Sequence, residues 1–394
     1  MDTYAAVMTG KGVGAISTIQ VFGDNAETVI GKIFIPANNK PLELKSGKIL
    51  LGIISDGTKT IDQVTIGCEG VNNFAINCHG NPLILADIMQ LLQTYGIELL
   101  TAEELLAKIL SAEESINSIA IEAVLAQAKA RTIEGSKILA NQIEAGLNKR
   151  AKKWLQNIET VGLDKIKSEV EQILVRSQTA NLIIYGCKAV LAGPPNTGKS
   201  TLLNYLSGRQ KAIVTDIEGT TRDWVSAGCQ IGPVALEMFD TAGLDEGLAL
   251  DTEGLIEQEA QEKSVQILKQ ADLVLLVLDN SRATNLLDDT LLEKIAGKKV
   301  LAVLNKSDLP GKFNIGKLPE QLKYTVQISA KFETGIDHLR EKISLLTGTR
   351  DFDLRAEVCT TARQKNLLEQ LKQTKSTNQT ATIITELLNG KLCV

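Results

Sequence analysis

Residues 193–200 read Gly-Pro-Pro-Asn-Thr-Gly-Lys-Ser, and this stretch decides the fold around it. It fits the P-loop pattern Gly-x-x-x-x-Gly-Lys-Ser/Thr, in which a glycine-rich loop wraps its backbone N–H groups around nucleotide phosphates. The apolar run at residues 188–192 is typical of a strand, and residues 201–206 are typical of the start of a helix. We therefore predict a nucleoside triphosphate site, with Lys199 at the β- and γ-phosphates and Ser200 as a ligand of Mg²⁺.

Two further segments fit the Mg²⁺ and γ-phosphate side of such a site. Residues 240–243 read Asp-Thr-Ala-Gly after a predicted strand, so Asp240 can hold Mg²⁺ through water and the Gly243 N–H can contact the γ-phosphate. Residues 219–223 read Gly-Thr-Thr-Arg-Asp between the P-loop and that strand. We expect Thr221 to complete the Mg²⁺ shell from there.

The base side is indicated by two segments that also follow predicted strands. Residues 305–308 read Asn-Lys-Ser-Asp, and Asp308 can accept two hydrogen bonds from the N1–H and amino groups of guanine, a donor pair that adenine lacks. Lys306 can lay its stem along the base. Residues 329–331 read Ser-Ala-Lys, where the Ala330 N–H can meet the guanine carbonyl. Five segments in this order predict GTP as the ligand.

The residues predicted to contact GTP come from these segments and from the loop that follows the first helix. They are Asn196, Thr197, Gly198, Lys199, Ser200, Thr201, Thr215, Asp216, Ile217, Glu218, Gly219, Thr220, Thr221, Asp240, Thr241, Ala242, Gly243, Asn305, Lys306, Asp308, Ser329, Ala330 and Lys331.

The hydrolytic machinery departs from the Ras pattern. Leu244 stands where Ras-like GTPases carry a glutamine that orients the attacking water, and leucine cannot do so. Arg222 is the one candidate for an arginine finger within the chain; otherwise a bound cation or a partner must supply the positive charge. Acidic side chains follow Leu244 in the sequence, namely Asp245, Glu246, Asp251 and Glu253.

Composition sets broad limits. The 394 residues are 44% hydrophobic and 23% charged, with a net charge of −5, which indicates two or three globular domains and excludes a generally basic nucleic-acid coat. Six scattered cysteines without a Cys-x-x-Cys pair, and only two histidines, argue against a zinc site or a disulfide scaffold. The first residues lack a basic segment, and the longest apolar run is residues 273–278. We expect a cytoplasmic protein without a signal peptide or membrane span.

The organisation of the chain follows from changes in pattern. Apolar runs alternate with helical patterns around the P-loop, which predicts a doubly wound, mostly parallel sheet. Helical composition lies on both sides of it, at residues 101–180 and 362–388. We predict a multidomain α/β chain in which a Ras-like P-loop GTPase domain is inserted in an α-helical domain, behind a small N-terminal α+β domain. The predicted ranges are 1–97 (N-terminal), 98–185 (helical, first part), 186–348 (GTPase) and 349–394 (helical, second part).

Residues 149–154 hold four Lys and Arg residues and one Trp. Such a cluster is typical of a solvated helix face, although it could also contact RNA. Because the cluster is short, we favour the solvated face.

Several segments resemble the MnmE (TrmE) tRNA-modification GTPases. The P-loop is followed by Asp-Ile-Glu-Gly-Thr-Thr-Arg-Asp at residues 216–223. Residues 2–6 (Asp-Thr-Tyr-Ala-Ala) and 14–17 (Gly-Ala-Ile-Ser) resemble the opening of that family, and residues 78–82 (Cys-His-Gly-Asn-Pro) resemble its His-Gly-Gly-Pro turn. The domain order resembles that of the family as well.

This resemblance implies hydrolysis of GTP with K⁺ in place of an arginine finger. It also implies that an acidic side chain in the segment after residues 240–243, called switch II, orients the attacking water. The matching residue is Asp251 or Glu253. The matching K⁺ ligands are Asn196, Thr215, Ile217 and Thr220.

The partners implied by the resemblance are GTP and GDP, a second copy in a homodimer formed by the N-terminal domains, an MnmG-like flavoprotein, and tRNA. G domains in the family pair across the nucleotide in an open/closed cycle. The substrate is the wobble uridine of certain tRNAs, and the one-carbon donor is of the formyl-tetrahydrofolate type.

The chain departs from the family where folate is held. Gln20 replaces an arginine, residues 70–77 lack the acidic Tyr-Thr-Gly-Glu-Asp-like loop, and residues 105–118 replace an Arg-Ala-Phe-Leu-Asn-Gly-Lys stretch. The chain ends with Gly-Lys-Leu-Cys-Val at residues 390–394 in place of Cys-x-Gly-Lys, and Cys393 lies outside that motif. We therefore predict an intact GTPase with a degraded folate site and a shortened C-terminal region.

Three functions remain open on the sequence. The first is a GTPase of tRNA wobble-uridine modification. The second is a divergent MnmE-like switch or interaction protein without one-carbon chemistry. The third is an Era- or Der-like ribosome-assembly GTPase, which the missing second G domain disfavours.

Overall fold

A computed structural model describes residues 2–10, 12–38, 43–113, 115–209, 226–240, 266–283 and 289–392. The chain divides into two compact units. One unit comprises Met1–Ile121 with Lys391–Val394, and the other comprises Glu122–Gly390. The four domain ranges predicted above stay predictions.

The N-terminal unit is built on a seven-stranded sheet in the order β3-β4-β5-β6-β2-β1-β7. Neighbouring strands are antiparallel except β1 and β7. Helices α1 and α2 contact the sheet, and one buried core joins these elements. The bounds are β1 Tyr4–Val7, β2 Ile16–Phe22, α1 Ala26–Ile33, β3 Phe34–Pro36, β4 Ile49–Ser55, β5 Thr60–Gly70, β6 Asn73–His79, α2 Pro82–Thr94, β7 Glu98–Leu99 and α3 Ala102–Ser111.

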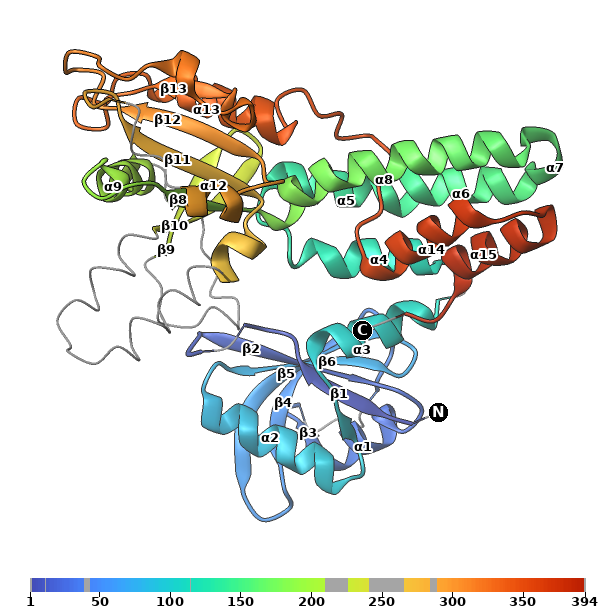
Figure 1. Ribbon diagram of the computed structural model, residues 1–394. Helices are drawn as coiled ribbons and strands as arrows, with labels where there is room; N and C mark the ends of the chain where they lie inside the picture. Colours follow the sequence, from blue (N-terminus) through green and yellow to red (C-terminus); the bar gives the residue numbers. More distant parts are fainter. Residues whose placement is uncertain are drawn as a thin grey trace. The chain divides into compact units, whose positions relative to one another are not determined.

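The helical part of the second unit is formed by segments far apart in the sequence. Helices α14 and α15 come after the nucleotide domain and contact α8 and α6, which come before it (Figure 1). The bounds are α4 Ser118–Gln127, α5 Ile133–Glu144, α6 Gly146–Gln156, α7 Ile158–Val161, α8 Leu163–Tyr185, α14 Ala362–Gln373 and α15 Thr377–Asn389.

A buried ion pair joins the two ends of this helical part. Arg363 Nη2 lies 2.8 Å from Glu122 Oε2, and both side chains are less than a tenth exposed. Arg363 also donates to the Glu386 and Leu387 carbonyls at the end of α15. A buried charge needs such partners, so these contacts tie α4, α14 and α15 together.

The cluster at residues 149–154 divides between exposed and packed side chains. Its three lysines are exposed. Trp154 is buried and donates to Glu169 at 2.7 Å, and Arg150 pairs with Glu357 at 2.6 Å. The cluster is therefore only partly a solvated face, because Trp154 and Arg150 hold α6 to its neighbours.

The nucleotide domain contains a six-stranded sheet in the order β13-β12-β11-β8-β10-β9. All its pairings are parallel except that of β9 with β10. This is the doubly wound, mostly parallel sheet predicted from the sequence. The bounds are β8 Cys187–Ala192, α9 Lys199–Arg209, β9 Ser226–Ile231, β10 Val234–Asp240, β11 Leu273–Asp279, α12 Asp289–Lys294, β12 Val300–Asn305, β13 Thr325–Gln327 and α13 Ile336–Thr347.

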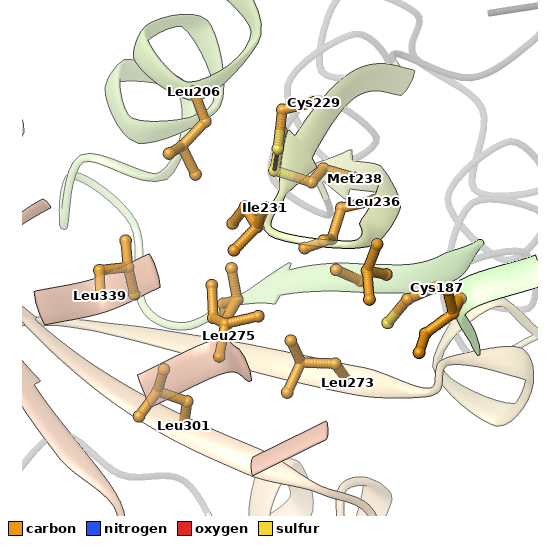
Figure 2. Packing of buried hydrophobic residues seen from close by; sticks show 14 of the residues in the cluster. Cys187, Leu206, Cys229, Ile231, Leu236, Met238, Leu273, Leu275, Leu301 and Leu339 are labelled. Carbon is orange, nitrogen blue, oxygen red and sulfur yellow. Dashed lines mark hydrogen bonds between the residues drawn. The ribbon is translucent and has the colours of Figure 1, made fainter. Parts of the chain in front are cut away.

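Apolar cores lie on both faces of this sheet. Figure 2 shows part of one core, where Leu206 of α9 and Leu339 of α13 lie over residues of the strands. Two cysteines belong to it, and burial raises the pKa of Cys187 to about 12 and that of Cys229 to about 11. These thiols are therefore packing residues that stay protonated at neutral pH.

Within the described ranges, no helix combines the length and apolarity needed to cross a membrane.

Candidate nucleotide-binding site

The P-loop joins the end of β8 to the start of α9. Its backbone is left-handed at three positions, with φ of 134° at Gly193, 61° at Asn196 and 95° at Gly198. A side chain at Gly193 would collide with the Val277 carbonyl, and one at Gly198 would collide with the Asn305 amide. The glycines are thus required by close approach as well as by backbone angle. The resulting curve ends at a helix N-terminus, which favours an anion.

Lys199 lies across this curve. Its Nζ donates to the Gly193 and Pro194 carbonyls at 2.9 Å each, and the residue is only 4% exposed. Thr197 Oγ1 donates to the Pro194 carbonyl as well, at 3.1 Å. The ammonium group is therefore held inside the loop, where it can meet phosphate oxygens.

Ser200 and Asp240 bring two oxygen donors together. Ser200 Oγ, in the first turn of α9, donates to Asp240 Oδ2 at the end of β10, at 2.6 Å. A hydroxyl and a carboxylate are the ligand types that Mg²⁺ takes in nucleotide sites. These two residues fit the predicted metal site.

Asn305 connects the phosphate loop to the loop predicted for the base. Its Nδ2 donates to the Thr197 carbonyl at 2.8 Å, and its Oδ1 accepts from the Ala330 N–H at 2.9 Å. The residue is 3% exposed. One side chain thus fixes the spacing between the ends of β12 and β13 and the P-loop.

Asp308 is held by the loop after β13. Ser329 Oγ donates to Asp308 Oδ1 at 2.5 Å, and Ser329 is fully buried. This hydrogen bond fixes the carboxylate that is predicted to read guanine. Lys331 Nζ lies 5.2 Å from the ring centroid of Phe332, which is a cation–π contact in the same loop.

Lys306 crosses from the base loop to the P-loop. Its backbone is left-handed, with φ of 64°, and its Nζ donates to the Asn196 carbonyl at 2.8 Å. The same Nζ lies 2.7 Å from Asp279 Oδ2 at the end of β11.

Asp279 belongs to this site but is not among the residues predicted from the sequence. Burial raises its pKa, but hydrogen bonds from Lys306 and Ser281 outweigh that effect and leave the pKa below its ordinary value. The carboxylate is therefore charged at neutral pH. A signal was present, since Asp279 ends the most apolar strand of the sheet at the edge where parallel strands bind ligands.

The other predicted residues fall in two groups. Thr201 lies exposed on α9. The rest lie outside the described residues, as do Arg222 and Leu244, and their roles stay predictions. They are Thr215, Asp216, Ile217, Glu218, Gly219, Thr220, Thr221, Thr241, Ala242, Gly243, Asp251 and Glu253.

Comparison with known proteins places this site in a family. A family described as 50S ribosome-binding GTPase matches residues 188–306. The tRNA modification GTPase MnmE of Clostridioides difficile (strain 630) is 30% identical over 380 residues, which cover 87% of this chain and 81% of that protein. The MnmE of Ligilactobacillus salivarius (strain UCC118) is 32% identical over 412 residues, covering 94% and 86%. The chain belongs to the MnmE family of tRNA-modification GTPases.

Membership of the MnmE family confirms the resemblance drawn from the motifs, and with it the predicted fold class. The match to the MnmE proteins extends over both units, whereas the ribosome-binding GTPase family matches only part of the nucleotide domain. The family assignment therefore rests on more than the P-loop. Among solved structures, the G domain of the T. maritima FeoB iron transporter is 26% identical, covers 41% of this chain and 98% of that domain, and has a TM-score of 0.30.

Proposed function

We propose that this MnmE-family protein binds GTP with Mg²⁺, hydrolyses it to GDP and phosphate, and uses the cycle in modification of the tRNA wobble uridine. The observation that carries the proposal is the double hydrogen bond of Asn305, which joins the phosphate loop to the Ala330 loop. A triphosphate and a guanine base need both loops at a fixed distance. The relatives named as tRNA modification GTPases support the substrate class.

Different residues of the site contact the phosphates, the guanine base and the metal ion. Lys199 meets the β- and γ-phosphates, and Asp308 accepts hydrogen bonds from guanine. The Ala330 N–H donates to Asn305 Oδ1, so its predicted hydrogen bond to the guanine carbonyl requires this contact to open. Ser200 and Thr221 would hold Mg²⁺, and the Asp240 carboxylate lies beside the Ser200 hydroxyl. The metal ion supplies positive charge to the phosphate oxygens.

Potassium is the proposed catalytic charge. Asn196, in its left-handed conformation at the rim of the P-loop, is one proposed ligand, and the carbonyls of Thr215, Ile217 and Thr220 are the others. Asp251 or Glu253 orients the attacking water in place of the Ras glutamine. Hydrolysis should therefore be faster in potassium than in sodium, and equal rates in the two salts would refute this assignment.

The proposed partners follow the family. A homodimer forms through the N-terminal units, the G domains open and close across the nucleotide, and an MnmG-like flavoprotein and tRNA complete the assembly in the cytoplasm.

A second function has one observation in its favour. Gln20 is 5% exposed, and its Nε2 donates to Glu69 at 2.9 Å and to Asn73 at 2.5 Å. Gln20, which replaces the family arginine, thus uses both amide hydrogens in hydrogen bonds to neighbouring side chains. This favours a switch whose G domain cycles without a formyl-tetrahydrofolate-type cofactor.

Mass spectrometry of tRNA nucleosides separates the two functions. Cells lacking this protein are complemented with the wild-type chain or with Lys199→Ala. Wobble-uridine modification that disappears in the deletion and returns only with the wild-type chain supports tRNA modification. An unchanged nucleoside profile contradicts it and supports the switch.

A further inference from the structure

We propose that Asp279 is a positioning residue for nucleotide binding, which holds Lys306 across the P-loop and so sets how long guanine nucleotides stay bound. The inference rests on the proposed binding of GTP at this site. It adds a residue that lies outside the GTPase sequence motifs.

The first support is the convergence of donors on one buried carboxylate. The Asp279 side chain is 5% exposed, and Lys306 Nζ lies 2.7 Å from its Oδ2. Ser281 donates to Oδ1 twice, from its N–H at 2.9 Å and from its hydroxyl at 2.6 Å. Arg282 lies further away, with Nε at 3.6 Å from Oδ2. The Ser281 bonds fix the rotamer of Asp279, so the carboxylate is oriented before it meets Lys306.

The second support is the position of Lys306 between two loops. Its Nζ reaches the Asn196 carbonyl and Asp279 at once, so a single ammonium joins the P-loop to the end of β11. The backbone is pinned at the same place, because Asn280 N–H donates to the Asn305 carbonyl at 2.9 Å. Lys306 is therefore set at both ends, by its backbone beside Asn305 and by its ammonium at Asp279.

A carboxylate is needed here for a physical reason. Lysine has a long stem with many rotamers and a strongly hydrated head, and 31% of the Lys306 side chain is exposed. Asn196 offers only a neutral carbonyl, which leaves the ammonium free to turn towards water. The charged Asp279 holds it over the P-loop, so the stem stays extended where the base must stack. Without Asp279, ordering this stem would cost entropy at each binding event.

A double-mutant cycle tests this inference. The variants are Asp279→Asn, Lys306→Met and their combination, and the measurements are the affinity and dissociation rate of fluorescent GDP. We expect Asp279→Asn to weaken GDP binding about tenfold, mainly through faster dissociation. The double variant should bind no more weakly than Lys306→Met alone, because Asp279 acts through Lys306. Additive losses, or GDP binding unchanged in Asp279→Asn, would overturn the proposal.

The control is Asp272→Asn, the same substitution at the residue directly before β11. Asp272 accepts a hydrogen bond from the Lys188 N–H far from the nucleotide site, so GDP binding should be unchanged. A loss of GDP affinity as large as that of Asp279→Asn would overturn the proposal by showing a general effect of strand stability.

A second pair of variants serves if Asp279→Asn does not fold. Lys306→Arg keeps a cation beside Asp279, whereas Lys306→Met does not, so GDP should dissociate more slowly from the arginine variant. Equal dissociation rates would overturn the proposal. If the wild-type chain itself fails to bind GDP, the proposed function fails, whereas wild-type binding with a negative cycle refutes only the role of Asp279.

Discussion

The nucleotide site and the Gln20 cluster of the N-terminal sheet, formed by Gln20, Glu69 and Asn73, use the same kind of side chain in opposite ways. Asn305 gives its amide to the backbone of two loops, at Thr197 and Ala330. Gln20 gives its amide to two other side chains, Glu69 and Asn73. In the first case the backbone is held in a curve whose own N–H groups can meet a ligand. In the second case the polar groups satisfy one another.

This difference teaches where binding capacity resides. A buried polar group must be hydrogen-bonded, but only bonds that shape the backbone leave other groups ready for a ligand. Lys199 and Lys306 add to the contrast, because both direct charged heads onto P-loop carbonyls. Experiments that remove one group at a time should therefore have large effects in the nucleotide site and small effects in the N-terminal unit.

The largest effect is expected from Lys199→Ala. The substitution removes a buried ammonium from the phosphate position, and hydrogen bonds to charged groups contribute about 1.5–3 kcal/mol each. We expect GTP and GDP affinity to fall at least about 100-fold, measured by titration calorimetry.

Lys188→Ala is the matched control for Lys199→Ala, since Lys188 lies exposed on the strand that leads into the same loop. Its nucleotide affinity should equal that of the wild-type chain. Retained GTP affinity in Lys199→Ala would refute the assignment of this loop as the phosphate site.

Asn305→Ala should have the next largest effect. It leaves the buried Thr197 carbonyl and Ala330 N–H without their partner, at about 1–3 kcal/mol for each unsatisfied group. We expect GDP affinity to fall about 10- to 100-fold and the free energy of unfolding to fall by about 2 kcal/mol. Fluorescence titration and urea denaturation measure the two quantities.

Asn314→Ala is the control for Asn305→Ala, because Asn314 caps an exposed turn in the same domain. If Asn305→Ala lowers stability while GDP affinity stays unchanged, the bridge serves folding alone and the contrast with Gln20 disappears.

The nucleotide domain could be predicted closely from the sequence because its signals are local. The apolar run at residues 273–278 became β11, and the P-loop pattern fixed β8 and α9 around it. Asp279 could not be assigned a role, since its function depends on Lys306, which lies 27 positions along the chain. A contact of that kind is set by tertiary packing and has no local pattern.

The N-terminal and helical regions were less predictable for the same reason. The capping box at Thr101 and the proline at the start of α2 are local signals that a sequence can show. The order of the seven strands depends on non-local pairing and was not foreseen. In the helical part, the sequence predicts a solvated face around Trp154, because helical spacing alone does not say which side chains are buried.

Acidification should produce a smaller effect, through the carboxylate of Asp279. The pKa of Asp279 is lowered from 3.8 in the folded protein, so its contribution to stability is complete above that value and is lost as the pH falls through the folded pKa. Asp279→Asn removes this dependence. Between pH 5 and pH 3 we expect the melting temperature to fall about 2 °C less in Asp279→Asn than in the wild-type chain.

Asn81→Ala serves as the reference for this acid limb, because the Asn81 side chain accepts from the Leu83 N–H at 2.9 Å. Its melting curve should fall in parallel with that of the wild-type chain. Calorimetric scans at a series of pH values measure both. Parallel curves for Asp279→Asn and the wild-type chain would show that the carboxylate is not under the influence of Lys306.

The smallest effect is expected where the N-terminal unit meets a folate derivative. Both amide hydrogens of Gln20 are used within the sheet, and a neutral amide lacks the charged planar fork of the arginine that the family carries there. Titration calorimetry with a formyl-tetrahydrofolate should therefore detect binding no tighter than about 1 mM, or none. GDP titrated into the same sample shows that the protein is active. Binding in the micromolar range that Gln20→Ala abolishes would reverse the contrast, because the hydrogen bonds to Glu69 and Asn73 would then orient the amide for a ligand as Asn305 orients the P-loop.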